Sequence, residues 1–407
     1  MLLPILGAVA ANQMLAVVCL GLGALAMVRI TAWPSRRLAL AAFLPALALL
    51  VFQPRAFDYT RIGSGANVYF SHQNWGRVID HAESLDGGLT TVAESRDPDG
   101  HRVLTLLTNG KFQGDNSLRR EMKAQAGFAL APLLHTTKRD RALVIGLGTG
   151  VSARVLRDAG FTSLDIVELS ADVTRIAERH FQEVNRSVTT RPDVRTYVTD
   201  GRNFLLTQHK TYDVISMEIA SIWFAGAGAL YNHEFYQLAK RRLAADGVLQ
   251  QWVQLHRISG QDIVAILATV RSEFRYVWLY FIGNQGIIVA ANQEALPGPE
   301  TVRAIDNASA LADVRAAFGG SVRSLLADRL LTPADTDRLL ALTQGNDFIS
   351  NDDNMFLEYS TPQGNVRDYA ESLGENLRAL KRIGAPDPVA WTRFPPETAG
   401  QSPSSRP

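Results

Sequence analysis

An alternation of short apolar stretches with amphipathic ones, from Arg141 to Ala291, constrains the fold of this chain more than any other feature. The apolar stretches are ALVIGLG, LDIVEL, VRTYVTD, YDVISMEI, GVLQQWVQL, YVWLYFIG and GIIVAA. Between many of them lie segments in which apolar residues recur with helical spacing. Strands that alternate with helices build a sheet that is mostly parallel and covered on both faces. The sequence therefore predicts an α/β fold with a doubly wound, mostly parallel sheet over residues 136–297.

The first apolar stretch ends in a glycine-rich turn, Gly146-Leu-Gly148-Thr-Gly150, which opens a predicted helix. Glycines let the backbone turn tightly and approach a ligand, and the start of a helix offers free N–H groups to it. The next predicted strand ends at Glu168, where a carboxylate can accept both hydroxyls of a ribose. These residues predict a nucleoside site.

The position of the third glycine indicates the kind of nucleoside. A dinucleotide fingerprint has Gly or Ala at the position of Val151, whereas here the glycine is Gly150. A GxGxG turn with an acid on the second strand is similar to the S-adenosylmethionine-type Rossmann fold. Asp200-Gly201 follows the third strand, where that fold places an acid against the adenine amino group. The alternative for Asp200 is a cap on a helix that begins at Arg202.

Residues from Arg102 to about Leu255 resemble the spermidine synthase family of polyamine aminopropyltransferases, particularly its bacterial members fused to membrane helices. The motifs that carry the resemblance are LLTNGKFQGD, VIGLGTG, VELS, VTDGRNF, YDVISME, LYNHEFYQLAKRRLAADGVLQQWVQL and, near the C-terminus, SNDDNMFLEYS. The resemblance implies a transferase of polyamine biosynthesis that moves an aminopropyl group from decarboxylated S-adenosylmethionine, as co-substrate, to a small amine. It implies no permanently bound cofactor, and a chain that can form a homodimer.

The resemblance also implies roles for single residues. The family's catalytic Asp closes the strand that reads YDVISME here, so Glu218 takes its place as general base or amine-orienting group. The family's hairpin glutamine, which contacts the nucleoside, corresponds to Gln113. A second acceptor-binding Asp is replaced by Ser221, and the family's Tyr-His pair by Ala124-Gln125. The amine acceptor therefore need not be putrescine.

Aromatic residues follow Glu218 in the sequence. Trp223, Phe224 and Tyr231 can form a wall on the acceptor side and cover a cation by cation–π contact, and packing in the core is the alternative. Two other functions also stay open. One is a methyltransferase that uses intact S-adenosylmethionine, and the other is a non-catalytic nucleoside- or polyamine-sensing domain of a transporter-like protein.

A run without charge from Leu2 to Val28 precedes these motifs. As a helix of about 1.5 Å per residue it exceeds the roughly 30 Å of a bilayer core. We therefore predict a transmembrane segment of one or two helices within residues 1–53, the lipid bilayer as a partner, and an inner-membrane location. Residues 38–52 reach only about 22 Å and are either a tilted crossing or an interfacial piece. Because Met1 opens directly on apolar sequence, we also expect a larger membrane unit.

The side of the membrane on which the rest of the chain would lie depends on whether residues 38–52 cross the bilayer. The positive-inside rule places Arg29, Arg36 and Arg37 in the cytoplasm, and a true second crossing would carry the rest of the chain to the other side. Because adenosyl donors are made in the cytosol, we expect the catalytic domain to be cytoplasmic.

The remaining regions complete the predicted organisation. Residues 54–135 form an N-terminal β-hairpin region with strands at VYF, LTTV and RVLTLLT, followed by a helix over Met122–Leu134. Residues 298–384 form a helical C-terminal region. Residues 385–407, rich in Pro and Ser, form a disordered tail.

Composition excludes several function classes. Beyond residue 53 the chain has 38 basic and 40 acidic residues, so it lacks the basic excess expected of a nucleic-acid binder. A single cysteine, Cys19, excludes an internal disulfide and a cysteine zinc site. The pair His233-Glu234 has no second histidine four residues on, and the Asp352-Asp353-Asn354 turn lacks the spacing of a calcium loop. We predict no metal site.

Overall fold

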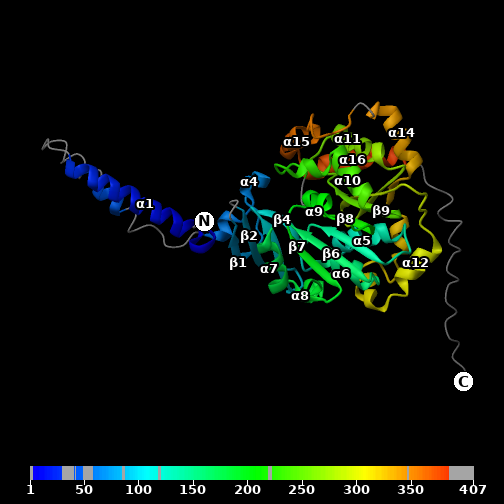
Figure 1. The fold of residues 1–407 in the computed structure, drawn as a ribbon, viewed down its shortest axis with the longest axis horizontal. Coiled ribbons are helices and arrows are strands. Elements are labelled where there is room, and N and C mark those ends of the chain that lie inside the picture. Colours follow the sequence, from blue (N-terminus) through cyan, green and yellow to red (C-terminus); the bar gives the residue numbers. More distant parts are fainter. Residues whose placement is uncertain are drawn as a thin grey trace, which may run out of the picture. The chain divides into compact units, whose positions relative to one another are not determined.

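The computed structural model describes residues 3–29, 41, 43–48, 58–84, 88–117, 121–218, 222–345 and 348–384 (Figure 1). The chain divides into two compact units, Met1–Gln113 and Gly114–Pro407. This division falls inside the region predicted as 54–135, and the predicted domain boundaries stay predictions. The predicted disordered tail, 385–407, and most of residues 38–52 lie outside the described residues.

Among the residues that the structure describes, the first unit contains helices and a small sheet. The helices are α1 (Leu3–Arg29), α3 (Tyr59–Ile62) and α4 (Ala66–Tyr69), and the sheet has the order β1 (Arg77–Glu83), β2 (Leu89–Arg96), β3 (Arg102–Thr108) and β4 (Lys111–Asp115). The turn between β3 and β4 has positive φ at both Asn109 and Gly110, which suits the twist of a two-residue hairpin. The predicted hairpin strands LTTV and RVLTLLT are β2 and β3.

The stretch VYF is not a strand, because its first two residues end α4 and Phe70 follows in the left-handed conformation. Gly65 precedes the helix, also with positive φ, so the chain folds into a single turn between two left-handed residues. A stretch of three apolar residues is too short for periodicity to separate a strand from a helical turn.

The apolar N-terminal run corrects the predicted location. Among the helices that the structure describes, none combines the length and the apolar character needed to cross a bilayer. Within α1 the backbone leaves the helical region at Gly7, with φ 73° and ψ 163°, so the run from Leu2 to Val28 is not one uninterrupted helix. The predicted inner-membrane location is therefore wrong, and the predicted transmembrane segment and lipid partner are without support.

The second unit is built on an eight-stranded sheet, and the prediction of a mostly parallel α/β sheet is confirmed. The strand order is β12-β10-β11-β9-β8-β5-β6-β7. The strands are β5 (Arg141–Ile145), β6 (Ser163–Glu168), β7 (Val194–Val198), β8 (Tyr212–Met217), β9 (Leu243–Val253), β10 (Tyr276–Ile282), β11 (Gln285–Ala291) and β12 (Arg329–Leu331). The strands from β7 to β9 pair in parallel, whereas β11, β10 and β12 join as antiparallel neighbours.

Helices cover both faces of this sheet (Figure 1). One group of helices in mutual contact comprises α5 (Glu121–Leu133), α6 (Val151–Asp158), α8 (Gln182–Asn185) and α13 (Ala312–Ala317). The other comprises α9 (Gly201–Thr207), α10 (His233–Arg242), α11 (Gly260–Glu273), α14 (Pro333–Thr343), α15 (Phe356–Ser360) and α16 (Tyr369–Ile383). Two further α-helices among the described residues of this unit are α7 (Ala171–His180), which contacts α8, and α12 (Pro299–Asp306).

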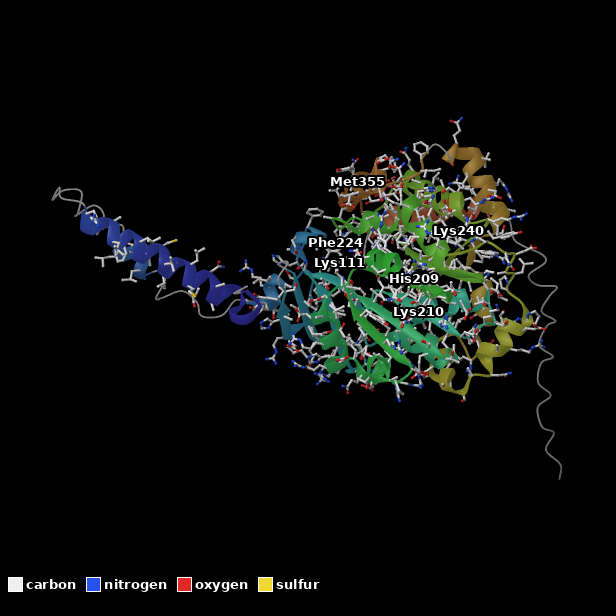
Figure 2. All side chains as sticks on the ribbon, in the orientation of Figure 1. Lys111, His209, Lys210, Phe224, Lys240 and Met355 are labelled. Carbon is white, nitrogen blue, oxygen red and sulfur yellow. The ribbon has the colours of Figure 1, made fainter. Side chains whose placement is uncertain are left out.

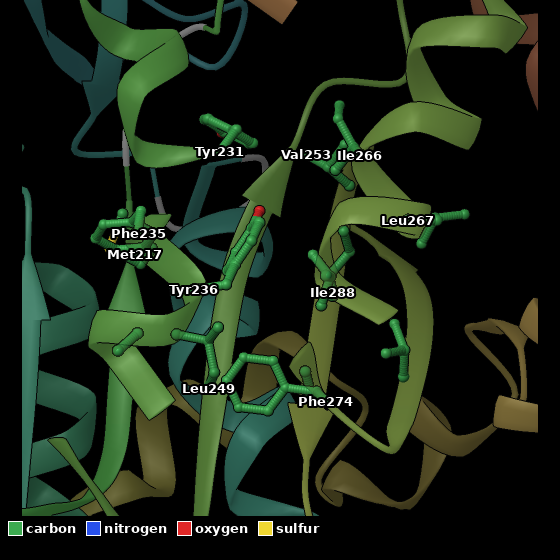
Figure 3. Packing of buried hydrophobic residues seen from close by; sticks show 14 of the residues in the cluster. Met217, Tyr231, Phe235, Tyr236, Leu249, Val253, Ile266, Leu267, Phe274 and Ile288 are labelled. Carbon is green, nitrogen blue, oxygen red and sulfur yellow. The ribbon is translucent and has the colours of Figure 1, made fainter. Parts of the chain in front are cut away.

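The main apolar core lies between the sheet and the second group of helices. Figure 3 shows side chains of β8, β9, α10 and α11 packed together, among them Met217, Leu249, Phe235 and Ile266. Residues 262–270 of α11 are all buried, and the helix begins with a capping box in which Ser259 and Asp262 bond each other's backbone N–H groups. Because side chains alternate along β8, Ser216 and Glu218 are directed away from this core, toward the face that carries α6.

A buried arginine joins α6 to the C-terminal region. The Arg154 side chain is 1% exposed and forms ion pairs with Asp158, at 2.9 Å, and with Asp313 of α13, at 2.6 Å. Residues 298–384, predicted as helical, contain α12 to α16, short 3-10 turns and the strand β12. The C-terminal region is therefore attached to the helix that follows the glycine turn.

Candidate active site

The site predicted from the sequence lies where the carboxyl ends of β5, β6 and β8 meet. The chain passes from β5 to β6 and β7 on one side and returns to β8 on the other, so β5 and β8 flank the topological switch point of the sheet. Open α/β sheets bind ligands at this point. The backbone N–H of Glu218 donates to the carbonyl of Ile145 at 2.9 Å, and the N–H of Gly146 donates to Val167 at 2.8 Å. The three strand ends are thus joined directly.

The glycine turn needs its glycines for conformation and for space. Gly146, Gly148 and Gly150 all have positive φ, at 93°, 52° and 84°. A Cβ atom on Gly146 would lie 2.7 Å from the carbonyl oxygen of Glu218, so no side chain fits there. Asn185 of α8, which is buried, donates to the carbonyl of Thr149 at 2.9 Å and fixes the turn from behind.

Glu168 ends β6 and is buried against the glycine turn. Its carboxylate accepts hydrogen bonds from the N–H groups of Leu147, at 2.8 Å, and Ser170, at 2.9 Å. Burial raises the pKa of Glu168, while these backbone hydrogen bonds act in the opposite direction. Each carboxylate oxygen can accept more than one hydrogen bond, so both can still accept from a ribose.

Asp200 caps α9, which begins one residue earlier than predicted, at Gly201. Its side chain accepts from the N–H of Asn203 at 2.8 Å, so the capping alternative is what the structure shows. Gly201 is buried, and a Cβ atom there would lie 2.4 Å from the Ile145 side chain, which explains the glycine. A cap uses one carboxylate oxygen, and the role of Asp200 in adenine binding stays a prediction.

Glu218 is partly buried and lies in a network of hydroxyl and amide groups. The hydroxyls of Ser152, on α6, and Ser216, on β8, donate to its two carboxylate oxygens, the second at 3.2 Å. Burial raises the pKa of the Glu218 carboxyl to about 8, and the two serine hydrogen bonds act to lower it. A carboxyl group with this pKa is mostly protonated at neutral pH and ionises as the pH rises through about 8, so it can take up and release a proton in mildly alkaline solution.

The network continues to Gln250 of β9, which is fully buried. Ser216 lies 2.6 Å from the Gln250 carbonyl oxygen, which also accepts from the N–H of Met217 at 3.2 Å. Since a hydroxyl has one proton, Ser216 donates to Glu218 or to Gln250 but not to both at once. The Gln250 amide nitrogen is buried without a partner among the described residues, and such a donor costs free energy unless a bound molecule pairs with it.

Residues 222–231, called the 222–231 loop below, follow Glu218 and include the predicted acceptor-side aromatics. Trp223 and Phe224 stack with ring centroids 4.8 Å apart, and the indole N–H of Trp223 donates to Gln254 at 3.2 Å. Tyr231 is buried in the apolar core, where its hydroxyl donates to the carbonyl of Trp252 at 2.9 Å. The structure thus shows the core alternative for Tyr231. Ser221 lies outside the described residues.

Gln113 ends the first unit, in β4, and its predicted contact with the nucleoside stays a prediction. In the second unit Gln125, which stands where the family has histidine, is buried on α5. Its amide group accepts from the Thr149 hydroxyl and donates to the carbonyl of Asp115 at 3.2 Å. Gln125 therefore supports the glycine turn from α5.

Sequence reasoning missed Ser152, Ser216 and Gln250. Ser216 could have been found because it precedes Glu218 by two residues on one strand, so both side chains point to the same face. Gln250 could have been found because it and Gln251 are two consecutive glutamines between apolar residues of one strand. Nothing in the local sequence marks Ser152 as a partner of Glu218, since 66 residues separate them.

A group of potential metal ligands lies away from these residues. Asp97, Asp99 and His101 lie at the turn between β2 and β3, with their ligand atoms within 4.8 Å of one another. Asp97 bonds the backbone N–H groups of Asp99 and His101, as an Asx turn does. The cluster is accounted for by the turn it stabilises.

Comparison with known proteins gives related sequences for the second unit. Residues 125–283 match the model of the spermine/spermidine synthase domain. Polyamine aminopropyltransferase 2 of Pseudomonas aeruginosa is 28% identical over 199 residues, 46% of this chain and 56% of that protein. Spermidine synthase of Schizosaccharomyces pombe is 25% identical over 201 residues, 47% of this chain and 65% of that protein. The chain thus spans about half the length of the curated relatives it matches.

Among solved structures, spermidine synthase from Thermotoga maritima aligns with a TM-score of 0.47 at 20% identity, covering 56% of this chain and 78% of that chain. The matched family domain contains the glycine turn, Glu168, Asp200 and Glu218.

Proposed function

The chain belongs to the spermidine synthase family, and from that premise we propose that it transfers an aminopropyl group from decarboxylated S-adenosylmethionine to an amine. The observation that carries the proposal is the Glu218 carboxyl group, whose pKa burial raises to about 8, at the carboxyl edge beside the glycine turn. The acceptor is a small amine of a kind that the site residues leave open.

The donor binds to the glycine turn in this proposal. Glu168 holds the ribose hydroxyls, and Asp200 lies where the adenine amino group would be bound. The first turn of α6 presents its backbone N–H groups to the same edge. These groups orient the donor, so its reactive carbon lies near Glu218 and the 222–231 loop.

The chemical step needs a base but no acid. The amine nitrogen attacks the aminopropyl carbon attached to sulfur, a carbon–nitrogen bond forms, the carbon–sulfur bond breaks, and the sulfonium leaves as neutral methylthioadenosine. Glu218 takes the proton that the ammonium form of the acceptor must lose. A carboxylate with a pKa of about 8 is a much better match for an ammonium than an ordinary carboxylate, because proton transfer is less uphill.

Calorimetric titration of the full chain with decarboxylated S-adenosylmethionine, S-adenosylmethionine and methylthioadenosine in parallel tests this function. We expect binding of the decarboxylated donor and of methylthioadenosine to be tighter than binding of the intact donor. An amine panel is then screened for release of methylthioadenosine. A clear preference for intact S-adenosylmethionine would replace the proposal with a methyltransferase, and binding without turnover of any amine would indicate a sensing domain.

A further inference from the structure

The 222–231 loop is held by a carboxylate that comes from much later in the chain. The N–H groups of Gly226 and Gly228 donate to the two oxygens of Glu358, at 2.6 and 3.0 Å. Hydrogen bonds from N–H groups to an ionised carboxylate are among the strongest in proteins. A Cβ atom on Gly228 would lie 2.6 Å from a Glu358 oxygen, so the close approach requires glycine.

A second attachment comes from Asp352. The two terminal guanidinium nitrogens of Arg202, two residues after Asp200, donate to the Asp352 carboxylate, and the hydrogen bond from Arg202 lowers the pKa of Asp352. Asn232, at the end of the loop, donates to the same carboxylate at 3.1 Å. The segment Ser350–Glu358, which contains Asp352 and Glu358, therefore joins the start of α9 to the end of the loop.

The base of the segment is fixed in the core. Ser350 is fully buried, its hydroxyl donates to Asn232 at 2.7 Å, and its N–H donates to Thr269 of α11 at 3.0 Å. The intervening turn is stabilised by Asn351, which accepts from the N–H groups of Asp353 and Asn354. The segment is thus connected by hydrogen bonds both to α11 and to the end of the loop.

We propose that Ser350–Glu358, called the C-terminal clamp below, holds the 222–231 loop in the conformation that receives the amine, and that Glu358 is a positioning residue for the acceptor. The inference rests on the proposed function, because the loop begins four residues after Glu218 in the sequence. Met355 of the clamp and Phe224 of the loop are labelled in Figure 2. Glu358 acts through the loop, since both its oxygens are bound to loop N–H groups.

The physical basis is the cost of ordering a loop. A loop that is ordered only part of the time binds its ligand more weakly, in proportion to the fraction of ordered molecules. Glu358→Gln replaces one accepting oxygen with a donating NH₂ group, which faces a loop N–H and repels it. Glu358 contacts the loop and has no role in donor binding in the proposed function. Glu358→Gln should therefore weaken binding of the amine and leave binding of the donor unchanged.

The test compares Glu358→Gln with Asp353→Asn in the full chain, because Asp353 is an exposed carboxylate of the same clamp. We expect Glu358→Gln to accelerate amide hydrogen exchange at Gly226 and Gly228 by about tenfold or more. The KM for the amine should rise by about tenfold, with kcat and the dissociation constant of methylthioadenosine nearly unchanged. Asp353→Asn should change none of these quantities.

Three outcomes would overturn the inference: unchanged exchange at both glycines, faster exchange without a change in the amine KM, or an equal loss of donor and amine binding. Glu358→Ala repeats the measurement without the repelling NH₂ group, and an amine KM unchanged in both variants also counts against the clamp. If the wild-type chain turned over no amine, the proposed function would fail. The C-terminal clamp would then be tested by amide hydrogen exchange at Gly226 and Gly228 alone.

Discussion

The proposed donor and acceptor sides of the site are built in different ways. On the donor side, contacts join residues that are near in sequence: 21 residues separate Leu147 from Glu168, and 36 separate Thr149 from Asn185. On the acceptor side, Gly226 and Glu358 are 132 residues apart, and Arg202 and Asp352 are 150 apart. The donor side follows from a local motif, whereas the acceptor loop depends on a segment that lies outside the matched family domain. In the proposed reaction, the choice of acceptor can therefore change while donor binding is kept.

Glu218→Gln should separate the two sides most strongly. Without the base, kcat/KM for the amine should fall by about 10²- to 10⁴-fold, the usual contribution of general base catalysis. Binding of methylthioadenosine, measured by calorimetry, should stay within about twofold, because in the proposed arrangement Glu218 acts on the amine and Glu168 holds the ribose. Glu183→Gln, an exposed carboxyl change on α8, is the control. Unchanged turnover in Glu218→Gln would remove Glu218 from the mechanism.

Gly146→Ala should disrupt the proposed donor and acceptor sides together, because Gly146 lies where the strand ends that carry their residues meet. The new side chain would be in a left-handed backbone and would collide with the Glu218 carbonyl, so we expect a loss of about 2 to 4 kcal/mol in the free energy of unfolding. Gly160→Ala is a matched control, since Gly160 has φ 100° but open space around its Cβ position. It should cost only about 1 to 2 kcal/mol from backbone strain. Equal losses in thermal or chemical unfolding would show that the collision is absent.

Glu168→Gln should weaken the donor side alone. Glutamine can accept from Leu147 or Ser170 but not from both, and it binds ribose hydroxyls less strongly than a carboxylate. We expect the dissociation constant of methylthioadenosine to rise by about tenfold, equivalent to about 1.4 kcal/mol. The KM for the amine at saturating donor should not change. A rise in the amine KM as large as that in the donor constant would show that the two sides are not independent.

Ser152→Ala should have the smallest effect, a shift in pH dependence. The Ser152 hydrogen bond stabilises the ionised form of Glu218 and lowers its pKa, so removing it should raise that pKa above about 8. Because the base must be ionised, activity rises with pH through this pKa, and its acidic limb should move to higher pH by about half a unit or more. Ser309→Ala, an exposed serine, should leave the profile in place. A limb that moved to lower pH would mean that Ser152 stabilises the protonated carboxyl.

The same contrast explains what the sequence could predict. The glycine turn and Glu168 were predicted from the strand–turn–helix pattern, and Glu218 from the family resemblance. The structure brings their strand ends together, because β6, β5 and β8 are parallel neighbours. No such rule connects Glu358 with Gly226, because that contact depends on how α15 and the loop pack in three dimensions. For the charge-free run at the N-terminus, the sequence instead predicted an uninterrupted helix that the structure does not show. Its composition indicated a spanning helix, but the backbone at Gly7 is not helical.

The buried arginine of α6 sets a limit on how this chain can be shortened. Arg154 needs Asp313 for part of its guanidinium group, and Asp313 lies beyond the end of the matched family domain at residue 283. A version trimmed to that domain would keep the nucleoside turn but leave a buried cation with only part of its counter-charge, which is strongly destabilising. Engineers who want a minimal catalyst must therefore retain the later region or replace Arg154 with an uncharged residue of similar volume.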